Sequence, residues 1–99
     1  MDGPAILVRA DDTTLQLQGA VTFESAAPLF REARRLLVPG IKNLDCRGIR
    51  GFDSSALSLL LACRRLASSR AMDISITGMG EQMLSLARLY GVEQLLKRC

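Results

Sequence analysis

Three consecutive polar residues, Asp53, Ser54 and Ser55, have the clearest capacity for chemistry in this sequence. They precede a leucine-rich stretch with helical spacing, so the Asp53 carboxylate is expected to cap a helix by accepting hydrogen bonds from its free amides. The two hydroxyls are candidate phosphorylation sites, because the free amides and dipole of a helix N-terminus tolerate a phosphate. Serine also suits a helix start without modification, so the residue types leave both interpretations open.

Composition excludes most hydrolytic mechanisms and the common metal sites. The chain contains no histidine, so it has no imidazole general base, no histidine metal ligand and no Ser-His-Asp or Cys-His nucleophile pair. Its three cysteines, Cys46, Cys63 and Cys99, form no CxxC motif, which favours reduced thiols in a cytosolic protein. The glycines match neither GxGxxG nor the Walker A pattern. We therefore expect no catalysis, no metal and no cofactor.

Length and charge narrow the class of protein further. With 99 residues, the chain is expected to form a single domain spanning residues 1–99. The formal net charge is +3, but the basic residues are scattered among acidic ones and aromatic residues make up only 4%, so we expect no nucleic-acid surface. No apolar run approaches the about 20 residues needed to cross a bilayer, so we expect no membrane insertion.

The hydrophobic pattern predicts the elements that must position Asp53. We expect strands where apolar residues alternate with polar ones, and helices where they recur every three or four residues. Pro28 is placed in the first turn of the first helix, and Pro39-Gly40 ends that helix. In chain order, the predicted elements are a β-hairpin over residues 5–9 and 15–18 with a turn at 11–12, a helix over 25–37, a strand over 43–47, a helix over 54–69, a strand over 72–77 and a helix over 81–90.

This order predicts an α/β fold of two layers with a small mixed sheet. A strand, a helix and a strand in succession form a right-handed crossover between parallel neighbours, whereas a hairpin is antiparallel. The strands alternate in polarity instead of being apolar throughout, which indicates helices packed mainly on one face and a solvated second face. The predicted order is ββαβαβα, followed by a short tail from Val92 to Cys99.

The helix predicted over residues 54–69 has two distinct faces. At 100° per residue, an outward stripe contains Ser54, Ser58, Leu61 and Arg65. A large leucine among small hydroxyls is typical of a surface on which a partner docks. A single exposed leucine is also common on protein surfaces, so spacing alone leaves the role of the stripe open. The face predicted to meet the sheet contains Ala56, Leu59, Leu60, Cys63, Leu66 and Ala67.

Two segments give the chain its resemblance to the STAS family, the domain shared by sulfate transporters and anti-sigma factor antagonists. The segments are LDCRGIRGFDSSALSLLLACRRL and MDISITGMGEQMLSLARLYGVEQLL. Together with the order of the elements, they extend the resemblance over essentially the whole chain. It implies the STAS fold. Some features of the sequence resemble one branch of the family, and others resemble a second branch.

One branch, the anti-sigma factor antagonists, has the pattern Asp-Ser-Ser-Gly, whose second serine is phosphorylated by a kinase that is itself an anti-sigma factor. The corresponding residue here is Ser55, although Ala56 replaces the glycine. That branch is expected to carry a further strand and helix, which the eight residues after Gly91 cannot supply. Resemblance to it implies a phosphorylation switch at Ser55, with Ser54 as the neighbouring candidate.

The other branch contains the MlaB-like proteins, small cytosolic subunits of phospholipid-transport ABC complexes. In it, a hydroxyl residue directly after the Asp lies at the contact with the ATPase subunit, and the segment LARLYGVEQLL resembles the end of these chains. We favour this branch. It implies a non-catalytic cytoplasmic subunit, peripheral to the inner membrane, that binds the ATPase subunit of a transporter with permease and substrate-binding subunits and supports outer-membrane lipid asymmetry. The residues expected to bind the partner are Asp53, Ser54, Ser58, Leu61, Arg65 and Tyr90.

Overall fold

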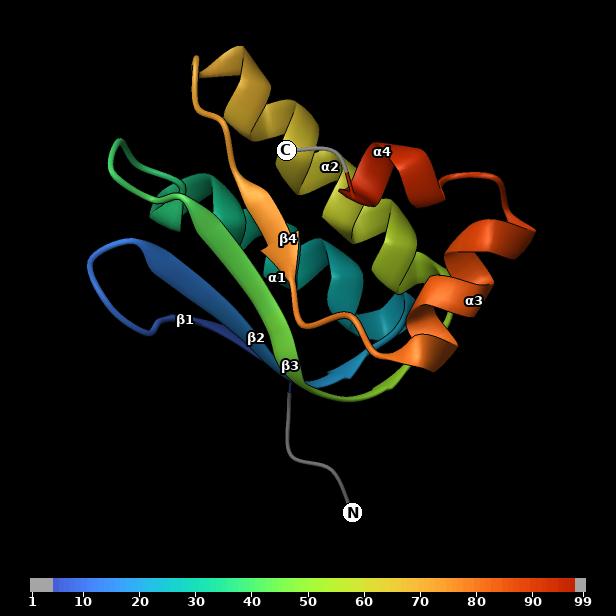
Figure 1. The fold of residues 1–99 in the computed structure, drawn as a ribbon. Coiled ribbons are helices and arrows are strands. Elements are labelled where there is room, and N and C mark those ends of the chain that lie inside the picture. Colours follow the sequence, from blue (N-terminus) through green and yellow to red (C-terminus); the bar gives the residue numbers. More distant parts are fainter. Residues whose placement is uncertain (1–4, 98–99) are drawn as a thin grey trace.

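One mixed sheet and four helices make up residues 5–97, the part of the chain that the structure, a computed structural model, describes (Figure 1). The sheet order is β1-β2-β3-β4, in which β1 runs antiparallel to β2 and the other neighbours run parallel. The α/β class, the mixed sheet and the order of the first seven elements confirm the prediction. The elements are β1 (Ile6–Arg9), β2 (Thr14–Val21), α1 (Phe23–Leu36), β3 (Asn43–Phe52), α2 (Ser54–Ser69), β4 (Ser75–Thr77), α3 (Glu81–Leu89) and α4 (Glu93–Lys97).

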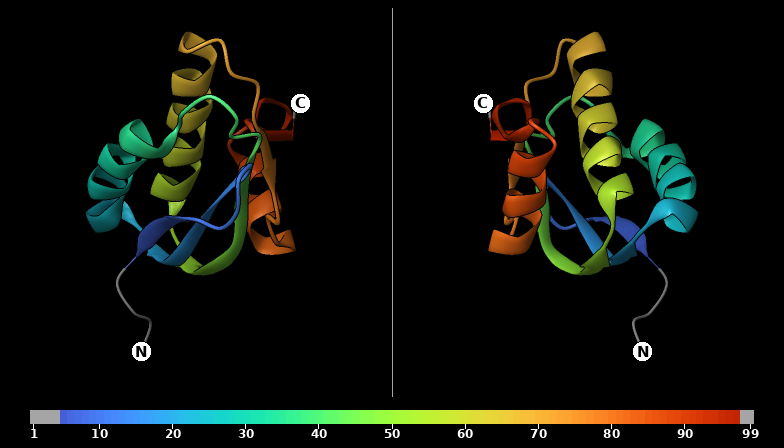
Figure 2. Two further views of the ribbon diagram at one scale, coloured as in Figure 1. Left: turned by 90° about the vertical axis from the view of Figure 1, so that its left-hand side faces the viewer. Right: turned by 90° about the vertical axis from the view of Figure 1, so that its right-hand side faces the viewer.

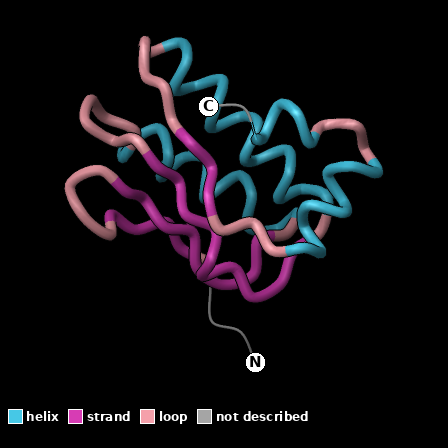
Figure 3. Tube along the Cα trace, viewed as in Figure 1, coloured by secondary structure: helices cyan, strands magenta, loops and turns pink. Residues whose placement is uncertain are grey.

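The helices and the strands form two layers (Figure 3). Helices α1 and α2 cover one face of the sheet, while α3 and α4 lie beside α2 near the β4 edge (Figure 2). Between the layers the core is apolar, as the alternating strands predicted. Its largest fully buried side chains are Leu15, Leu17, Val21, Leu37, Leu44, Leu60, Ile74 and Leu96.

Helix α1 begins two residues earlier than predicted, at Phe23 instead of Ser25. The reason is a capping contact, in which Ser25 Oγ accepts a hydrogen bond from the Thr22 amide at 2.9 Å and donates one to the Ala20 carbonyl at 2.9 Å. The predicted place of Pro28 in the first turn was therefore wrong, because it lies in the second turn. Pro28 removes one helical hydrogen bond, but it is exposed, so the unpaired carbonyl can bind water.

Strand β3 is longer than predicted because it continues through Gly48 and Gly51. Gly48 pairs with Gln18 of β2, and a Cβ atom at Gly48 would lie 2.7 Å from the carbonyl oxygen of Leu17, so this close approach requires glycine. Two register shifts against β2 bend β3, and its last residues curve toward the start of α2 (Figure 1). Beyond β4, Gly78 has a φ of 73° and turns the chain out of the sheet.

Helix α2 has the predicted bounds, Ser54–Ser69, but the strand after it is shorter than predicted. Ala71 adopts a left-handed conformation with a φ of 57°, and the Met72 amide donates a hydrogen bond to the Ala67 carbonyl at 2.8 Å. This arrangement closes the last turn of α2. Residues 72–74 therefore belong to the connection, and β4 begins only at Ser75.

The segment after Gly91, predicted as a tail, contains the short helix α4. Leu96 is fully buried, and α4 folds back against α2, α3 and β4. The remaining predicted tail residue of chemical interest, Cys99, lies outside the described residues. The other two thiols are buried, and burial raises the pKa of Cys46 and of Cys63 to about 12. Both thiols therefore stay protonated and unreactive at neutral pH.

Candidate functional site

Asp53 caps α2 as predicted, and it also contacts α1. Its Oδ1 accepts a hydrogen bond from the Ser55 amide at 2.8 Å, and its Oδ2 accepts one from the Phe23 amide at 3.1 Å. These two amides, Phe23 first, lower the pKa of the exposed Asp53 carboxyl below its ordinary value. The carboxylate therefore joins the first turns of the two helices, in addition to lying on the predicted partner-binding surface.

Four of the predicted partner-binding residues line a single depression between α2 and the corner that connects α3 to α4. Ser54, Ser58 and Leu61 come from α2, and Tyr90 comes from the end of α3. The depression has a volume of about 270 Å³. We call it the docking depression, and its full lining is Ser54, Leu57, Ser58, Leu61, Tyr90 and Val92.

A second, more open hollow of about 530 Å³ adjoins the docking depression and shares Ser54 and Tyr90 with it. Asp53 lines this hollow, together with residues of α3. Two large apolar side chains that line this hollow are strongly exposed, since Leu89 is 78% and Tyr90 is 58% accessible. Exposed apolar groups of this size, gathered around a hollow, are typical of a protein-binding surface.

Two predicted residues lie outside both hollows. Arg65 is exposed, one turn beyond Leu61 on α2, and lines neither of them. Ser55 is half-buried and also lines neither hollow, while its amide is engaged by Asp53. Of the two serines that follow Asp53, Ser54 therefore lines the docking depression and Ser55 does not.

Sequence reasoning missed four apolar residues of this region. Leu57 precedes Leu61 by one helical turn, and that spacing could have placed it on the same side of α2. Val92 and Leu89 could not be assigned to this region from the sequence, because their positions depend on how the chain turns after α3. Phe23, which is 81% exposed, belongs to the region because its amide is held by Asp53, a contact that no local pattern predicts.

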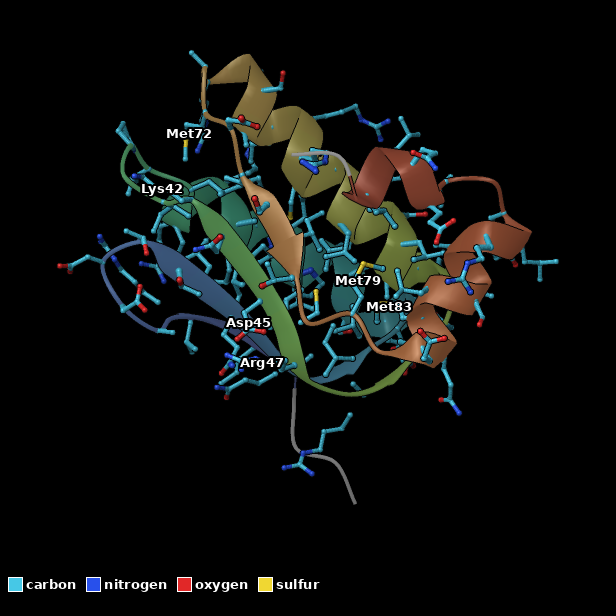
Figure 4. All side chains as sticks on the ribbon, viewed as in Figure 1. Lys42, Asp45, Arg47, Met72, Met79 and Met83 are labelled. Carbon is cyan, nitrogen blue, oxygen red and sulfur yellow. The ribbon has the colours of Figure 1, made fainter. Side chains whose placement is uncertain are left out.

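A polar cluster on the outer face of the sheet positions the turn that leads into α3. Asp45, only 4% exposed, accepts hydrogen bonds from Arg47 at 3.0 Å and from Gln16 at 3.1 Å, and Gln18 donates to Gln16 at 2.8 Å. Asp45 and Arg47 lie next to each other along β3 (Figure 4). The Arg47 side chain lowers the pKa of the Asp45 carboxyl. A Cβ atom at Gly78 would lie 2.7 Å from Asp45 Oδ1, so this turn packs directly on the cluster.

Within residues 5–97, no group of three or more histidine, cysteine or acidic residues is placed so that it could hold a metal ion. The same described stretch contains no helix with the length and apolar character needed to cross a membrane.

A sequence model of the family described as "Mlab, STAS domain" matches residues 7–97. The chain belongs to this family. The MlaB-like STAS assignment made from the sequence is thus confirmed, and with it the STAS fold.

Two curated relatives of this MlaB-like STAS protein have the same name. The "Intermembrane phospholipid transport system binding protein MlaB" of Escherichia coli (strain K12) is 30% identical over 79 residues, which are 80% of this chain and 80% of that protein. The protein of the same name from Shigella flexneri matches with the same identity and coverage. Both relatives are named as binding proteins of a phospholipid transport system.

A solved structure of the anti-sigma factor antagonist SpoIIAA in its unphosphorylated form has the same fold. It superposes with a TM-score of 0.68 and covers 90% of this chain and 82% of its own. The sequence identity is 12%, so the likeness concerns the fold alone. The MlaB-like protein thus shares one architecture with both branches that the sequence indicated.

Proposed function

We propose that this protein is a non-catalytic STAS subunit that binds the ATPase subunit of an ABC-type phospholipid transporter. Its relationship to binding proteins of an intermembrane phospholipid transport system supports the class of partner. The single observation that carries the proposal is the docking depression, in which Ser54, Leu61 and Tyr90 come together. Exposed Leu89 lines the adjoining hollow. The predicted contacts Asp53 and Ser58 belong to the same surface, and Arg65 extends it along α2.

The chemistry of this surface suits a protein partner better than a small substrate. Apolar side chains line most of the depression, and the hydroxyls of Ser54 and Ser58, which also line it, can bond to backbone groups of the partner. A partner side chain that fills the depression would bury Leu61 and Tyr90, and burial of such residues dominates binding energy at protein interfaces. The small side chains of Ser54 and Ser58 also leave room for the partner's backbone to approach α2 closely.

Such a subunit influences ATP hydrolysis only through binding. A rigid domain stabilises the assembled state of the ATPase if it binds that state more tightly than the others, and a coupling of about 1–3 kcal/mol is typical. We place the protein on the cytoplasmic side of the inner membrane, held there through the ATPase and, with it, the permease and substrate-binding subunits. In that complex it would support the lipid asymmetry of the outer membrane.

Affinity capture of the tagged protein from detergent-solubilised native cells, with mass spectrometry of the captured chains, tests the proposal. We expect an ABC ATPase together with its permease, and we expect both to be lost from the capture by Ser54→Arg. Capture of a kinase-like anti-sigma factor in their place would overturn the proposal.

The alternative function is an anti-sigma factor antagonist controlled by phosphorylation of Ser55. It has in its favour the Asp-Ser-Ser segment at the start of α2 and a candidate residue, Ser55, that is only half-buried. Incubation with such a kinase and ATP separates the two functions. The transporter role predicts no phosphate on Ser55 or Ser54, whereas stoichiometric phosphate on Ser55, absent from Ser55→Ala, would support the alternative.

A further inference from the structure

Arg64 donates hydrogen bonds to three backbone carbonyl groups from two distant segments. Its Nη1 bonds to the carbonyl of Ile74 at 2.7 Å, its Nε to that of Leu95 at 2.8 Å and its Nη2 to that of Leu96 at 3.4 Å. A guanidinium group offers five donors in a planar fork, which allows it to bind several carbonyls at once. Arg64 therefore ties α2 both to α4 and to the residue that precedes β4.

Helix α4 depends on such contacts for its position. It has five residues, far fewer than an isolated helix needs to be stable in water. The carbonyl groups of its last turn lack partners within the helix and lie at the negative end of its dipole, where a cation is favoured. Arg64 supplies that cation, and burial of Leu96 holds the other side of the helix.

Helix α4 in turn positions one wall of the docking depression. The Leu96 amide donates a hydrogen bond to the Val92 carbonyl at 3.2 Å, and the Val92 side chain lines the depression beside Tyr90. Across the same corner, Arg88 forms an ion pair with Glu93 at 3.0 Å. Arg64 is therefore connected to the depression through α4 and the hydrogen bond between Leu96 and Val92.

We propose that Arg64 is a positioning residue of the docking surface, which holds α4 against α2 and thereby fixes Val92 in the geometry that the ATPase subunit binds. This inference rests on the proposed function. If the partner binds only the conformation with α4 in place, its apparent affinity falls in proportion to the fraction of molecules in that conformation.

Arg70 provides a matched control. Its Nη1 donates hydrogen bonds to the carbonyls of Arg34 at 2.9 Å and Leu37 at 2.8 Å, at the end of α1 and away from the depression. Arg64→Met and Arg70→Met thus remove the same type of contact from two different helix ends. Arg64→Lys keeps the charge but loses the fork that reaches several carbonyls.

The test combines hydrogen exchange of residues 91–96 in the free protein with titration of the purified ATPase subunit. We expect Arg64→Met to accelerate exchange in this segment and to weaken ATPase binding roughly tenfold, as when the competent fraction falls to about a tenth. Arg64→Lys should give smaller changes in both. Arg70→Met should leave exchange of residues 91–96 and the affinity as in the wild type.

Unchanged exchange of residues 91–96 in Arg64→Met would overturn the positioning role. Equal losses of affinity in Arg64→Met and Arg70→Met would also overturn it, because they would indicate a general effect of stability. Failure of the wild-type protein to bind the ATPase would refute the proposed function and the part of Arg64 in docking. In that case the exchange data would still decide whether Arg64 holds α4 in place.

Discussion

Asp53 and Phe23 lie 30 residues apart in the sequence, and in the folded protein Oδ2 of Asp53 accepts a hydrogen bond from the Phe23 amide at 3.1 Å. The other carboxylate oxygen caps α2 through the amide of Ser55. One side chain therefore fixes the first turns of α1 and α2 relative to each other. Asp53 also lines the hollow that adjoins the docking depression, so helix capping and the proposed docking surface depend on the same residue.

Replacement of Asp53 should reduce stability in a pH-dependent way. The folded-state pKa of this carboxyl is lowered from 3.8, so its ionised form stabilises the fold above that pH, and the stabilisation is lost as the pH falls through the lower folded-state value. Urea unfolding of Asp53→Ala should therefore show a deficit at pH 7 that shrinks below pH 3.8. Asp53→Asn, whose amide oxygen can still cap α2 but carries no charge, should show a smaller deficit at pH 7 that shrinks over the same pH range. Asp12→Ala, with no such contact to lose, serves as control, and an equal deficit in it would contradict the capping role.

Gly78→Ala should destabilise the protein by about 1–3 kcal/mol, because a left-handed φ strains any other residue and the new methyl group would meet the Asp45 cluster. The φ of Gly78 is 73°, and a Cβ atom there would lie 2.5 Å from Cγ of Arg47. Gly80→Ala, two residues further on, is the control. A Cβ atom at Gly80 meets nothing within 4 Å, so its cost should stay below about 1 kcal/mol, mostly from a poorer helix cap. Chemical denaturation compares the two, and similar losses would argue against close packing of the turn on Asp45.

Ala71→Gly should stabilise the protein by about 0.5–1 kcal/mol, because glycine relieves the left-handed strain at the end of α2 but costs more entropy on folding. Ala71 has a φ of 57°. The same substitution inside α2, Ala62→Gly, should instead destabilise it by about 1 kcal/mol. Thermal and urea unfolding of both variants decide the matter, since a loss of stability at both positions would contradict the strained conformation of Ala71.

Phe23→Ser should leave the free energy of unfolding nearly unchanged and weaken ATPase binding at least about fivefold, as expected when an aromatic anchor of an interface is lost. Its side chain is 81% exposed, and its capping contact with Asp53 uses the backbone amide, which the substitution keeps. Val38→Ser is the control, because Val38 is also exposed but follows the opposite end of α1. Unaltered binding of Phe23→Ser would limit the docking surface to α2 and the α3–α4 corner.

The sequence predicted the central helix well because its signals are local. An aspartate cap and an uninterrupted helical period define Ser54–Ser69 without reference to the rest of the chain. The bounds of β3 and β4 depend on tertiary contacts, such as the approach of Leu17 that requires glycine at position 48. Those contacts have no local signal, so both strands were predicted with the wrong length.

In the candidate site, the residues on α2 were predicted from local signals, whereas those at the corner between α3 and α4 were not. The stripe on α2 identified Ser54, Ser58 and Leu61, and family resemblance added Tyr90, but the opposite wall of the depression comes from a corner that the sequence left without structure. Arg64 carries no signal of its own, because its role depends on where α4 ends. Arg65 and Ser55 satisfied the sequence patterns, yet they lie outside both hollows.

The central claim, that the docking depression binds the ATPase subunit, is tested most directly by titrating the purified ATPase with the wild-type protein, Ser54→Arg and Ser68→Arg. Both serines are exposed on α2, but Ser68 lies at the end of the helix away from the depression. Leu61→Asp, checked for folding by circular dichroism, gives a second disruption of the same surface. We predict that Ser54→Arg weakens binding at least roughly 30-fold, the effect of an interface hot spot of about 2 kcal/mol, and that Ser68→Arg binds as the wild type does. Equal binding by Ser54→Arg and the wild-type protein would contradict the account.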